Sequence, residues 1–489
     1  MTKDMGRAAT ICASCTWLSS IRLVAIAALV SGCDVAKNVT KAGVDYEGPS
    51  AMPTLKDMQS ATAPGFKSAP GNLPECLGRL TFDVPQAVQW PTFYKNDAAG
   101  LFNRSFSENV ADAGDEMRFG DTRVAVIEAP TMALRSKVLE GTPMALIARL
   151  QRQMEETRLY VTELKKKMGP SEATAREIKR AEKTIAGWRE TVREDQANIE
   201  PFAAGLADSV SYWTSEAIAN DEAERFSILR TYLTRSDRIY VFESRSPMER
   251  AAAKEVHKKE FIALLNRFRP RAANEIPAEL GVCIPFGFIK DDGRTLTEFK
   301  QSFRFQNAPG VLYTIQTGNV HSRNIKAAGL LAATRAATGT LGSADEEEIQ
   351  PLIKQRIGPR PFSIGGLAGQ QGGIVLEIAR SGASKHEAYS IFTGYSGWLG
   401  TAVLPYILVD MRTVSRDQAP ELKQDPPPFQ QSMDRLQVLL KGMRLRPTTP
   451  PMPELTPGGA SWIRPSGSTS VIYRATGRRD STGRSAEHA

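Results

Sequence analysis

The sequence predicts an α+β protein made of two units, each an antiparallel sheet with helices, and a long helical hairpin inserted into the first unit. Three observations support this fold class. Apolar residues alternate in several short segments, as they do in half-buried strands. One long charged segment instead repeats its apolar residues in heptads. The chain has 489 residues, a length that suits two or three domains, and 41% of them are hydrophobic, which is enough to form a buried core.

The first 33 residues have the features of a targeting segment rather than of folded structure. Basic residues precede the apolar run from Leu23 to Val30, which is too short to span a bilayer. The run ends in Val30-Ser31-Gly32-Cys33, which resembles the lipobox of bacterial lipoproteins. We therefore expect lipidation at Cys33, and Asp34 favours retention at the inner membrane. An ordinary secretory leader with a chance cysteine is the alternative.

Two further segments show little apolar periodicity. Residues 34–72 are rich in Pro, Gly, Ala, Ser and Lys, which is typical of a flexible tether. Residues 448–489 contain several prolines followed by Gly, Ser and Arg, which favours a disordered tail. The folded part is expected to divide into an N-terminal unit, residues 73–275, and a C-terminal unit, residues 276–447.

The N-terminal unit is expected to open with a strand that begins near Cys76, in which Leu80, Phe82 and Val84 share one face. Further elements are expected at a strand over Val124–Ile127, a hairpin made of Phe226–Leu233 and Arg238–Glu243, and a helix from about Pro247 to Phe268.

The insertion in this unit covers about residues 144–200. One heptad seam is formed by Ile147, Leu150, Met154, Thr157, Val161, Leu164 and Met168, and a second by Ile178, Ala181, Ile185, Trp188, Val192 and Ile199. Gly169, Pro170 and Ser171 separate the seams, a combination that stops one helix and caps the next. The sequence predicts an antiparallel helical hairpin about 35 Å long. It is either a solvated support for its own sheet or an arm that reaches a partner.

The C-terminal unit is expected to open with one strand containing Val282, Ile284, Phe286 and Phe288. The following elements are a hairpin of Phe299–Phe305 and Val311–Thr317, a helix near Arg323–Ala337, strands near Ile374–Ala379, Ala388–Thr393 and Tyr406–Met411, and a helix from about Phe429 to Met443. Each unit opens at a lone cysteine and closes with a similar motif, Arg267-Phe268-Arg269-Pro270 or Arg444-Leu445-Arg446-Pro447. A duplication is plausible on these grounds.

The composition disfavours several classes of function. A net charge of +8 is small for this length and is not concentrated on one segment, so we expect no nucleic-acid partner. The four histidines, His257, His321, His386 and His488, are too far apart in sequence for metal-ligand spacing, so no metal site and no cofactor is predicted.

The candidate catalytic residues are weak. Glycines 365, 366, 369, 372 and 373 precede the β-favouring Ile374 and Val375, so turns are favoured over a phosphate loop. Ser384 and His386 lie at a predicted hairpin tip rather than at a strand-to-helix elbow. The segment from Gly394 to Gly397, which contains Ser396, also lacks the hydrolase pattern. We expect no catalytic site and no small-molecule substrate.

Cys76 and Cys283 are the two cysteines that remain after the leader and the expected lipid site. In an oxidising compartment they can form a disulfide, which would close a loop of about 207 residues and tie the two units together. Two buried free thiols would give the same sequence pattern, so both alternatives stay open.

Four short motifs occur in order along the chain: Cys76-Leu77-Gly78-Arg79, Gly281-Val282-Cys283-Ile284, Gly366-Leu367-Ala368-Gly369 and Arg444-Leu445-Arg446-Pro447. Over residues 73–447 their order and spacing resemble the two-domain immunity proteins of type VI secretion that neutralise class-four antibacterial lipases. The resemblance implies a periplasmic inhibitor whose two lobes clamp a cognate secreted lipase, protecting the producing cell.

Such an inhibitor is expected to bind through a few aromatic or arginine anchors. Trp213, Trp398 and Tyr395 are eligible, although each also suits core packing. Two other functions stay open: an envelope hydrolase that uses Ser384 or Ser396, and a structural or ligand-binding lipoprotein without activity.

Overall fold

The computed structural model describes residues 66–94, 101–102, 104–107, 116–167, 171–218, 221–247, 254–319, 352–378, 385–397, 403–414, 416 and 419–448. The predicted leader with Cys33, most of the expected tether and all but the first residue of the expected tail lie outside these residues. So does the helix expected near Arg323–Ala337.

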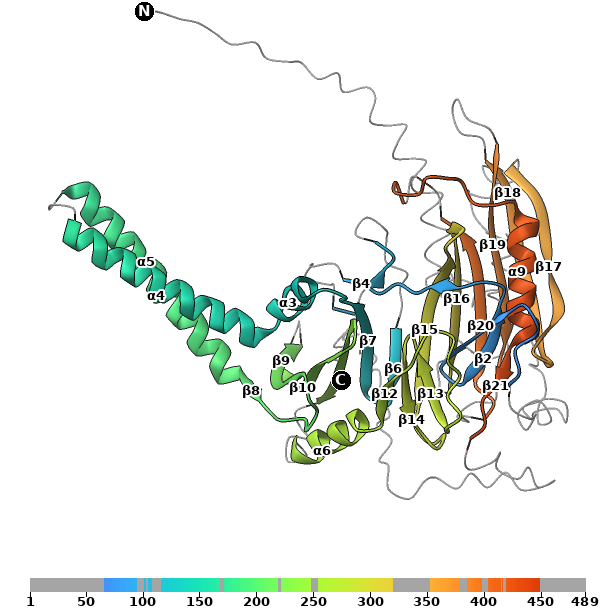
Figure 1. The fold of residues 1–489 in the computed structure, drawn as a ribbon, viewed down its shortest axis with the longest axis horizontal. Coiled ribbons are helices and arrows are strands. Elements are labelled where there is room, and N and C mark those ends of the chain that lie inside the picture. The colour runs from blue at the N-terminus through green and yellow to red at the C-terminus, as the bar shows by residue number, and fades with distance from the viewer. Residues whose placement is uncertain are drawn as a thin grey trace, which may run out of the picture. The chain divides into compact units, whose positions relative to one another are not determined.

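One antiparallel sheet runs through most of the described chain (Figure 1). Its strands follow the order β17-β18-β19-β20-β16-β15-β6-β7-β11-β10-β9-β8, and β3 also pairs with β15. We call the residues up to 275 the N-terminal half and the residues from 276 the C-terminal half. The N-terminal half contributes β3 (Val88–Gln89), β6 (Glu116–Phe119), β7 (Thr122–Glu128), β8 (Ile199–Pro201), β9 (Ser209–Ile218), β10 (Asp221–Arg235) and β11 (Arg238–Pro247). The C-terminal half contributes β15 (Thr297–Phe305), β16 (Ala308–Gly318), β17 (Ile353–Ile364), β18 (Leu367–Ile378), β19 (His386–Tyr395) and β20 (Tyr406–Thr413).

The α+β prediction is confirmed, and the predicted hairpins β10–β11 and β15–β16 are present. Strands from the two halves meet at the β15–β6 pair, so the two expected units share one sheet. The boundary between residues 275 and 276 stays a prediction.

The prediction of one long strand at each cysteine was wrong, because each cysteine lies in a small three-stranded sheet. The first sheet consists of β1 (Leu73–Leu77), β2 (Leu80–Val84) and β21 (Arg444–Leu445). The second consists of β12 (Phe268–Pro270), β14 (Gly287–Lys290) and β13 (Gly281–Ile284). Each cysteine lies in a hairpin because the chain reverses through a left-handed residue, Gly78 with φ 56° or Phe286 with φ 57°. The apolar residues continue on both sides of each turn, which made two strands look like one. A further pair joins β4 (Phe93–Tyr94) to β5 (Arg104–Ser105).

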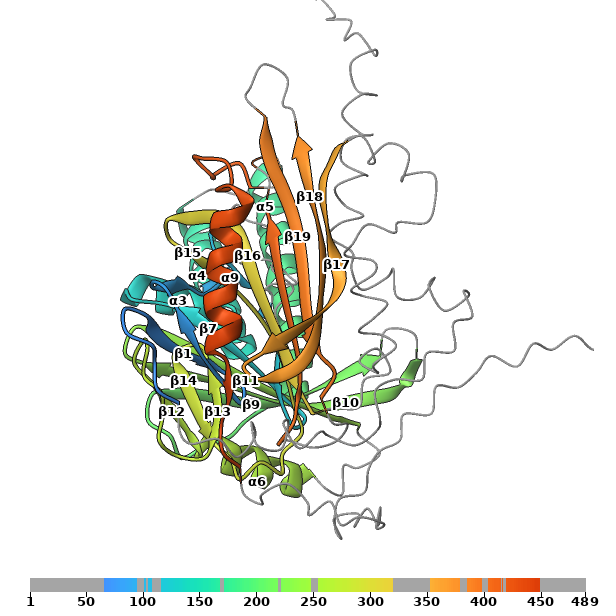
Figure 2. The same ribbon diagram turned by 90° about the vertical axis from the view of Figure 1, so that its right-hand side faces the viewer.

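Helix α9 (Phe429–Gly442) packs against β2 and against β17 and β19 of the large sheet, and Figure 2 shows it alongside the C-terminal strands. It buries Phe429, Met433, Leu436 and Leu440, whose spacing places them on one helical face. The hydroxyl group of Tyr313 donates to the carbonyl oxygen of Ser432 at 3.2 Å, so the helix is fixed to the sheet by polar contacts as well.

Two helices of the N-terminal half differ from expectation. Helix α6 spans Lys254–Leu265 and ends before the predicted Phe268, because Phe268 belongs to strand β12. Pro247, predicted to start the helix, belongs to strand β11. Helix α3 (Met132–Glu140), capped by the Thr131 side chain, was not predicted, since its apolar residues have no clear period.

The predicted helical hairpin is confirmed as α4 (Pro143–Lys167) and α5 (Glu172–Asn198). Ser171 caps α5 by accepting a hydrogen bond from the Thr174 amide at 3.1 Å. The helices pack on each other through the predicted seams, with Ile147, Leu150 and Val192 in one cluster. They contact α3 and β8 at their base. Among the described residues, no helix combines the length and apolarity needed to cross a membrane.

Candidate functional site

A disulfide joins the two cysteine hairpins at the junction of the N-terminal and C-terminal halves. Cys76 in β1 and Cys283 in β13 are bonded, with their Cα atoms 5.7 Å apart, and both side chains are fully buried. The backbone joins the same two hairpins, since the Gly78 amide donates to the Cys283 carbonyl at 2.7 Å and the Cys283 amide donates to Gly78 at 2.8 Å. Segments about 200 positions apart are thus held in one register.

A buried ion pair lies beside the disulfide. The guanidinium group of Arg271 donates to the Glu75 carboxylate and to the carbonyl oxygens of Cys76 at 3.1 Å and Ile284 at 3.2 Å. Both charged side chains are at most 3% exposed. Because each charge satisfies the other and the donors of Arg271 reach both hairpins, the pair fixes how the hairpins meet.

Two more buried arginines connect the C-terminal segment to the same place. Arg446 donates to the carbonyl oxygens of Pro277 at 2.9 Å and Glu279 at 2.7 Å. Arg79 donates to the Pro447 carbonyl at 3.0 Å and lies 3.8 Å from the Asp291 carboxylate. Burial lowers the pKa of each guanidinium group to about 10, which still leaves both charged at neutral pH.

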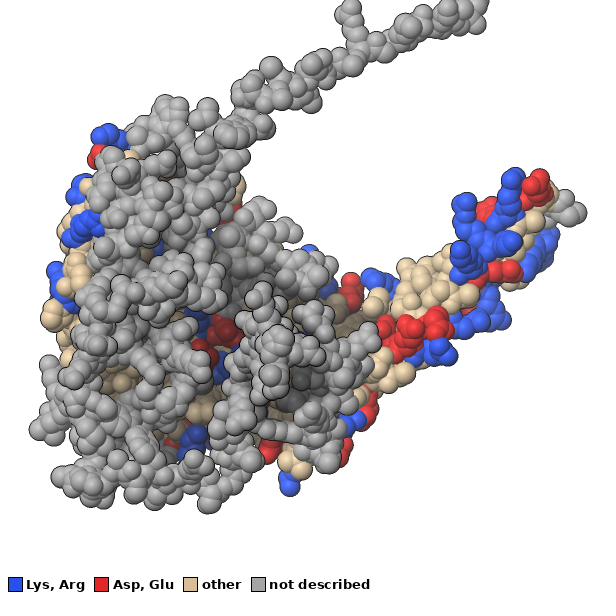
Figure 3. Space-filling view, turned by 180° about the vertical axis from the view of Figure 1, so that it is seen from behind, with Lys and Arg blue, Asp and Glu red and all other residues tan. Residues whose placement is uncertain are grey.

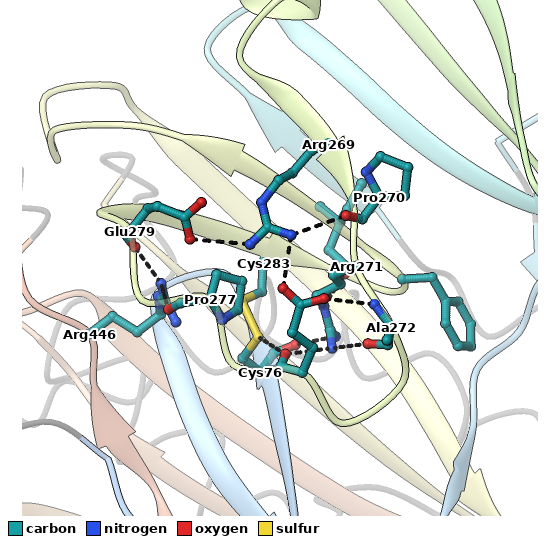
Figure 4. A network of polar contacts seen from close by, with 12 residues as sticks. Cys76, Arg269, Pro270, Arg271, Ala272, Pro277, Glu279, Cys283 and Arg446 are labelled. Carbon is teal, nitrogen blue, oxygen red and sulfur yellow. Dashed lines mark hydrogen bonds and ion pairs between the residues drawn. A yellow bond between two sulfur atoms is a disulfide. The ribbon is translucent and has the colours of Figure 1, made fainter.

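The repeated motifs meet in space (Figure 4). In the first motif Arg269 donates to the carboxylates of Glu275 at 2.8 Å and Glu279 at 3.1 Å. In the second, Arg446 reaches the backbone of the same segment. Each motif also follows a helix and adds a short strand to a cysteine hairpin, β12 to β14 and β21 to β2. The repeat therefore builds the junction between the halves.

Part of this junction was not predicted from the sequence. No sequence pattern indicated Glu75, Arg271 or Asp291, because a buried ion pair between residues almost 200 positions apart leaves no local pattern. The cysteines and the arginine motifs were visible, and the structure brings them together.

The candidate catalytic residues form no site in the part of the chain that the structure describes. His386 starts β19, while Ser384 lies outside the described residues. Gly365 and Gly366 form the turn between β17 and β18 with positive φ angles, so a turn is confirmed there. Gly369, Gly372 and Gly373 instead lie within strand β18, where the prediction of turns was wrong. No group of His, Cys, Asp and Glu suited to a metal ion occurs within the described ranges.

The three aromatic residues predicted as candidate binding anchors lie in different surroundings. Tyr395 is 5% exposed at the end of β19 and is therefore a core residue. Trp213 in β9 is half-buried, donates to the Ser227 hydroxyl at 2.7 Å and carries the Lys254 ammonium group 4.1 Å from its ring centroid. Trp398 lies outside the described residues.

Comparison with solved structures gives matches of low identity. They include an immunity protein named TplEi, of the T6SS from Pseudomonas aeruginosa, and a Tle4–Tli4 complex. Both chains are 16% identical to this one over 78% of its length, cover 98% and 99% of their own lengths, and give TM-scores of 0.42 and 0.45. No curated protein matches the chain.

A family model matches residues 275–448. It is described as the C-terminal domain of Tle cognate immunity protein 4. The matched range begins just before the Cys283 hairpin and ends just after Arg446, so it contains one side of the junction. The family match thus confirms, over residues 275–448, the resemblance to the lipase-neutralising immunity proteins.

Proposed function

We propose that the protein binds and inhibits a cognate lipase delivered by type VI secretion, and so protects the cell that produces it. The match of residues 275–448 to the Tle cognate immunity protein 4 model is the observation that carries this proposal. The protein would act by occupying the lipase surface and would transform no substrate.

The affinity must be high, because one free lipase molecule turns over many lipids. We expect a dissociation constant in the nanomolar range or below, about 12 kcal/mol of binding free energy. An interface well above about 1,000 Å² follows. A surface of this size needs lobes that keep a fixed geometry, which the disulfide and the buried arginines of the junction would provide.

We further propose that the protein is exported and held at the membrane by lipidation of Cys33, with residues 34–72 as a tether. The order Val30-Ser31-Gly32-Cys33 supports the lipid site, and Asp34 favours the inner membrane. The Cys76–Cys283 disulfide agrees with an oxidising compartment, where such bonds persist.

Protection of cells tests both proposals. We expect the cognate lipase to be encoded beside this gene. A bacterial strain that sends this lipase into its periplasm should survive only when it also makes this protein. Replacing Cys33 by Ser should abolish radiolabelled palmitate incorporation, whereas the matched change Cys12→Ser should not. Death despite abundant folded protein would count against immunity, and unchanged palmitate labelling would count against the lipid site alone.

A further inference from the structure

The free end of the helical hairpin is basic. Residues 158–183, which surround the turn between α4 and α5, contain eight Lys and Arg residues against four Asp and Glu. The rest of the hairpin contains four against five, so the positive charge gathers at one end of the arm. Figure 3 shows Lys and Arg side chains gathered toward that end.

The carboxylates of this region are already engaged. Glu163 pairs with Lys167 at 2.6 Å, Glu182 with Lys165 at 3.0 Å and Glu172 with Arg176 at 3.6 Å, and Glu177 accepts a hydrogen bond from Tyr160. Three exposed cations of α5, Lys179, Arg180 and Lys183, form no ion pair with any carboxylate that the structure describes. We refer to these three residues as the distal cations.

Helix stability does not explain this arrangement. The apolar seam of α5 faces α4, whereas Lys179, Arg180 and Lys183 lie on the opposite face of the helix. Cations are favoured by the helix dipole in a last turn, yet the last turn of α5 has no basic residue.

We propose that the distal cations dock the arm on the anionic phospholipid headgroups of the membrane. Each cation close to an anionic bilayer strengthens binding by about fivefold, so three of them on one helical face support a reversible contact.

The proposal rests on the lipid anchor at Cys33. From Cys33 to Leu73, the start of β1, the chain has 40 residues, which span at most about 140 Å. A bilayer therefore stays within reach of the arm at high effective concentration, so a weak contact is sufficient. This constant proximity favours a bilayer over an acidic protein as the occupant.

Vesicle sedimentation tests the proposal. The mature chain without its lipid contains every described element, and it is mixed with vesicles of phosphatidylcholine alone or with about 30% phosphatidylglycerol. We expect binding only to the anionic vesicles and weakening in high salt. Replacing the distal cations by Gln should lower the binding constant at least tenfold. The matched control replaces Arg149, Arg152 and Arg189, at the other end of the hairpin, by Gln and should bind like the unaltered chain.

The outcomes separate this proposal from the proposed function. Equal vesicle binding by the distal variant and the unaltered chain, or no binding by either, overturns the proposal. It is also overturned if the distal variant binds vesicles normally but loses inhibition of the lipase, since the arm would then face the lipase. Inhibition is measured on a soluble ester without vesicles, so a failure of the unaltered chain there counts against the proposed function alone.

Discussion

Single arginines hold the two halves of the chain together at the residue scale. Arg271 and Glu75 are buried together beside the disulfide, and the arginine also binds backbone carbonyls of both hairpins. A buried charge that loses its partner cannot recover its hydration, so each partner depends on the other.

Replacing Arg271 by Met should therefore lower the free energy of unfolding by about 3 kcal/mol or more, because it leaves the Glu75 carboxylate buried without a counter-charge. Urea denaturation at pH 7 measures the change. The matched variant Arg269→Met removes an arginine whose carboxylate partners are about one-third exposed or more, and should cost less than about 1 kcal/mol. Equal losses in the two variants would contradict the role given to Arg271.

Stability should also depend on pH through Glu243, whose carboxylate is buried between Arg230 and Arg245. Burial by itself raises the pKa of Glu243, but the charges and hydrogen bonds of the two arginines outweigh it and hold the pKa below its usual value of 4.5. A lowered folded-state pKa stabilises the fold above the unfolded-state pKa, and this stabilisation is lost as the pH falls through the folded-state value.

The unaltered chain should thus be more stable than Glu243→Gln at pH 7, and the difference should shrink steadily below about pH 4.5. Urea denaturation at several pH values from 7 to about 3 measures it. The matched variant Glu190→Gln, at an exposed pair on α5, should show little difference at any of these pH values. A difference for Glu243→Gln that stays constant with pH would show that the charge of Glu243 is not involved.

The helical hairpin shows, at the scale of elements, how far a periodic pattern can be trusted. Its seams, its turn and the cap at Ser171 were all predicted, because a two-helix arm depends only on contacts between neighbouring segments. Strand β17 was missed since Gly358, Pro359 and Pro361 interrupt it, and the position of a strand at a sheet edge depends on its partner β18. The Cys283 hairpin was read as a single strand because left-handed φ at Phe286 has no sequence signature.

Leu150 and Leu159 lie on the same helix and give a matched test of the seam. Leu150 is 9% exposed against α5, whereas Leu159 is 58% exposed on the outer face. Leu150→Ala should destabilise the hairpin by about 2 kcal/mol, and Leu159→Ala should change its stability by less than about 0.5 kcal/mol. Amide hydrogen exchange in α4 and α5 reports this local stability. Faster exchange in the Leu159 variant than in the Leu150 variant would contradict the packing.

The halves are joined, at the scale of the whole molecule, by one sheet and one disulfide. The sequence left the pairing of Cys76 with Cys283 open, because two buried thiols leave the same pattern. It also did not predict the continuous sheet, since the β15–β6 pairing joins strands about 180 positions apart. The arginine motifs near each cysteine were visible, but their convergence depends on the tertiary fold.

The disulfide closes a loop across a sequence separation of 207, which contributes roughly 5 kcal/mol in the chain-entropy model. Mature protein that is denatured without reductant should react with no thiol reagent at Cys76 or Cys283, and the Cys76→Ala/Cys283→Ala variant should unfold at much lower urea. Two reactive thiols per chain would show that the bond does not form.

Inhibition of the lipase by stoichiometric binding is the central claim, and a titration tests it most directly. Phospholipase activity of the cognate lipase, whose gene we expect beside this one, is measured at a fixed lipase concentration well above the expected dissociation constant, while the purified protein is added. Residual activity should fall in a straight line and reach zero at one protein per lipase. Full activity in the presence of a tenfold excess of folded protein, or hydrolysis of the substrate by this protein alone, would contradict the account.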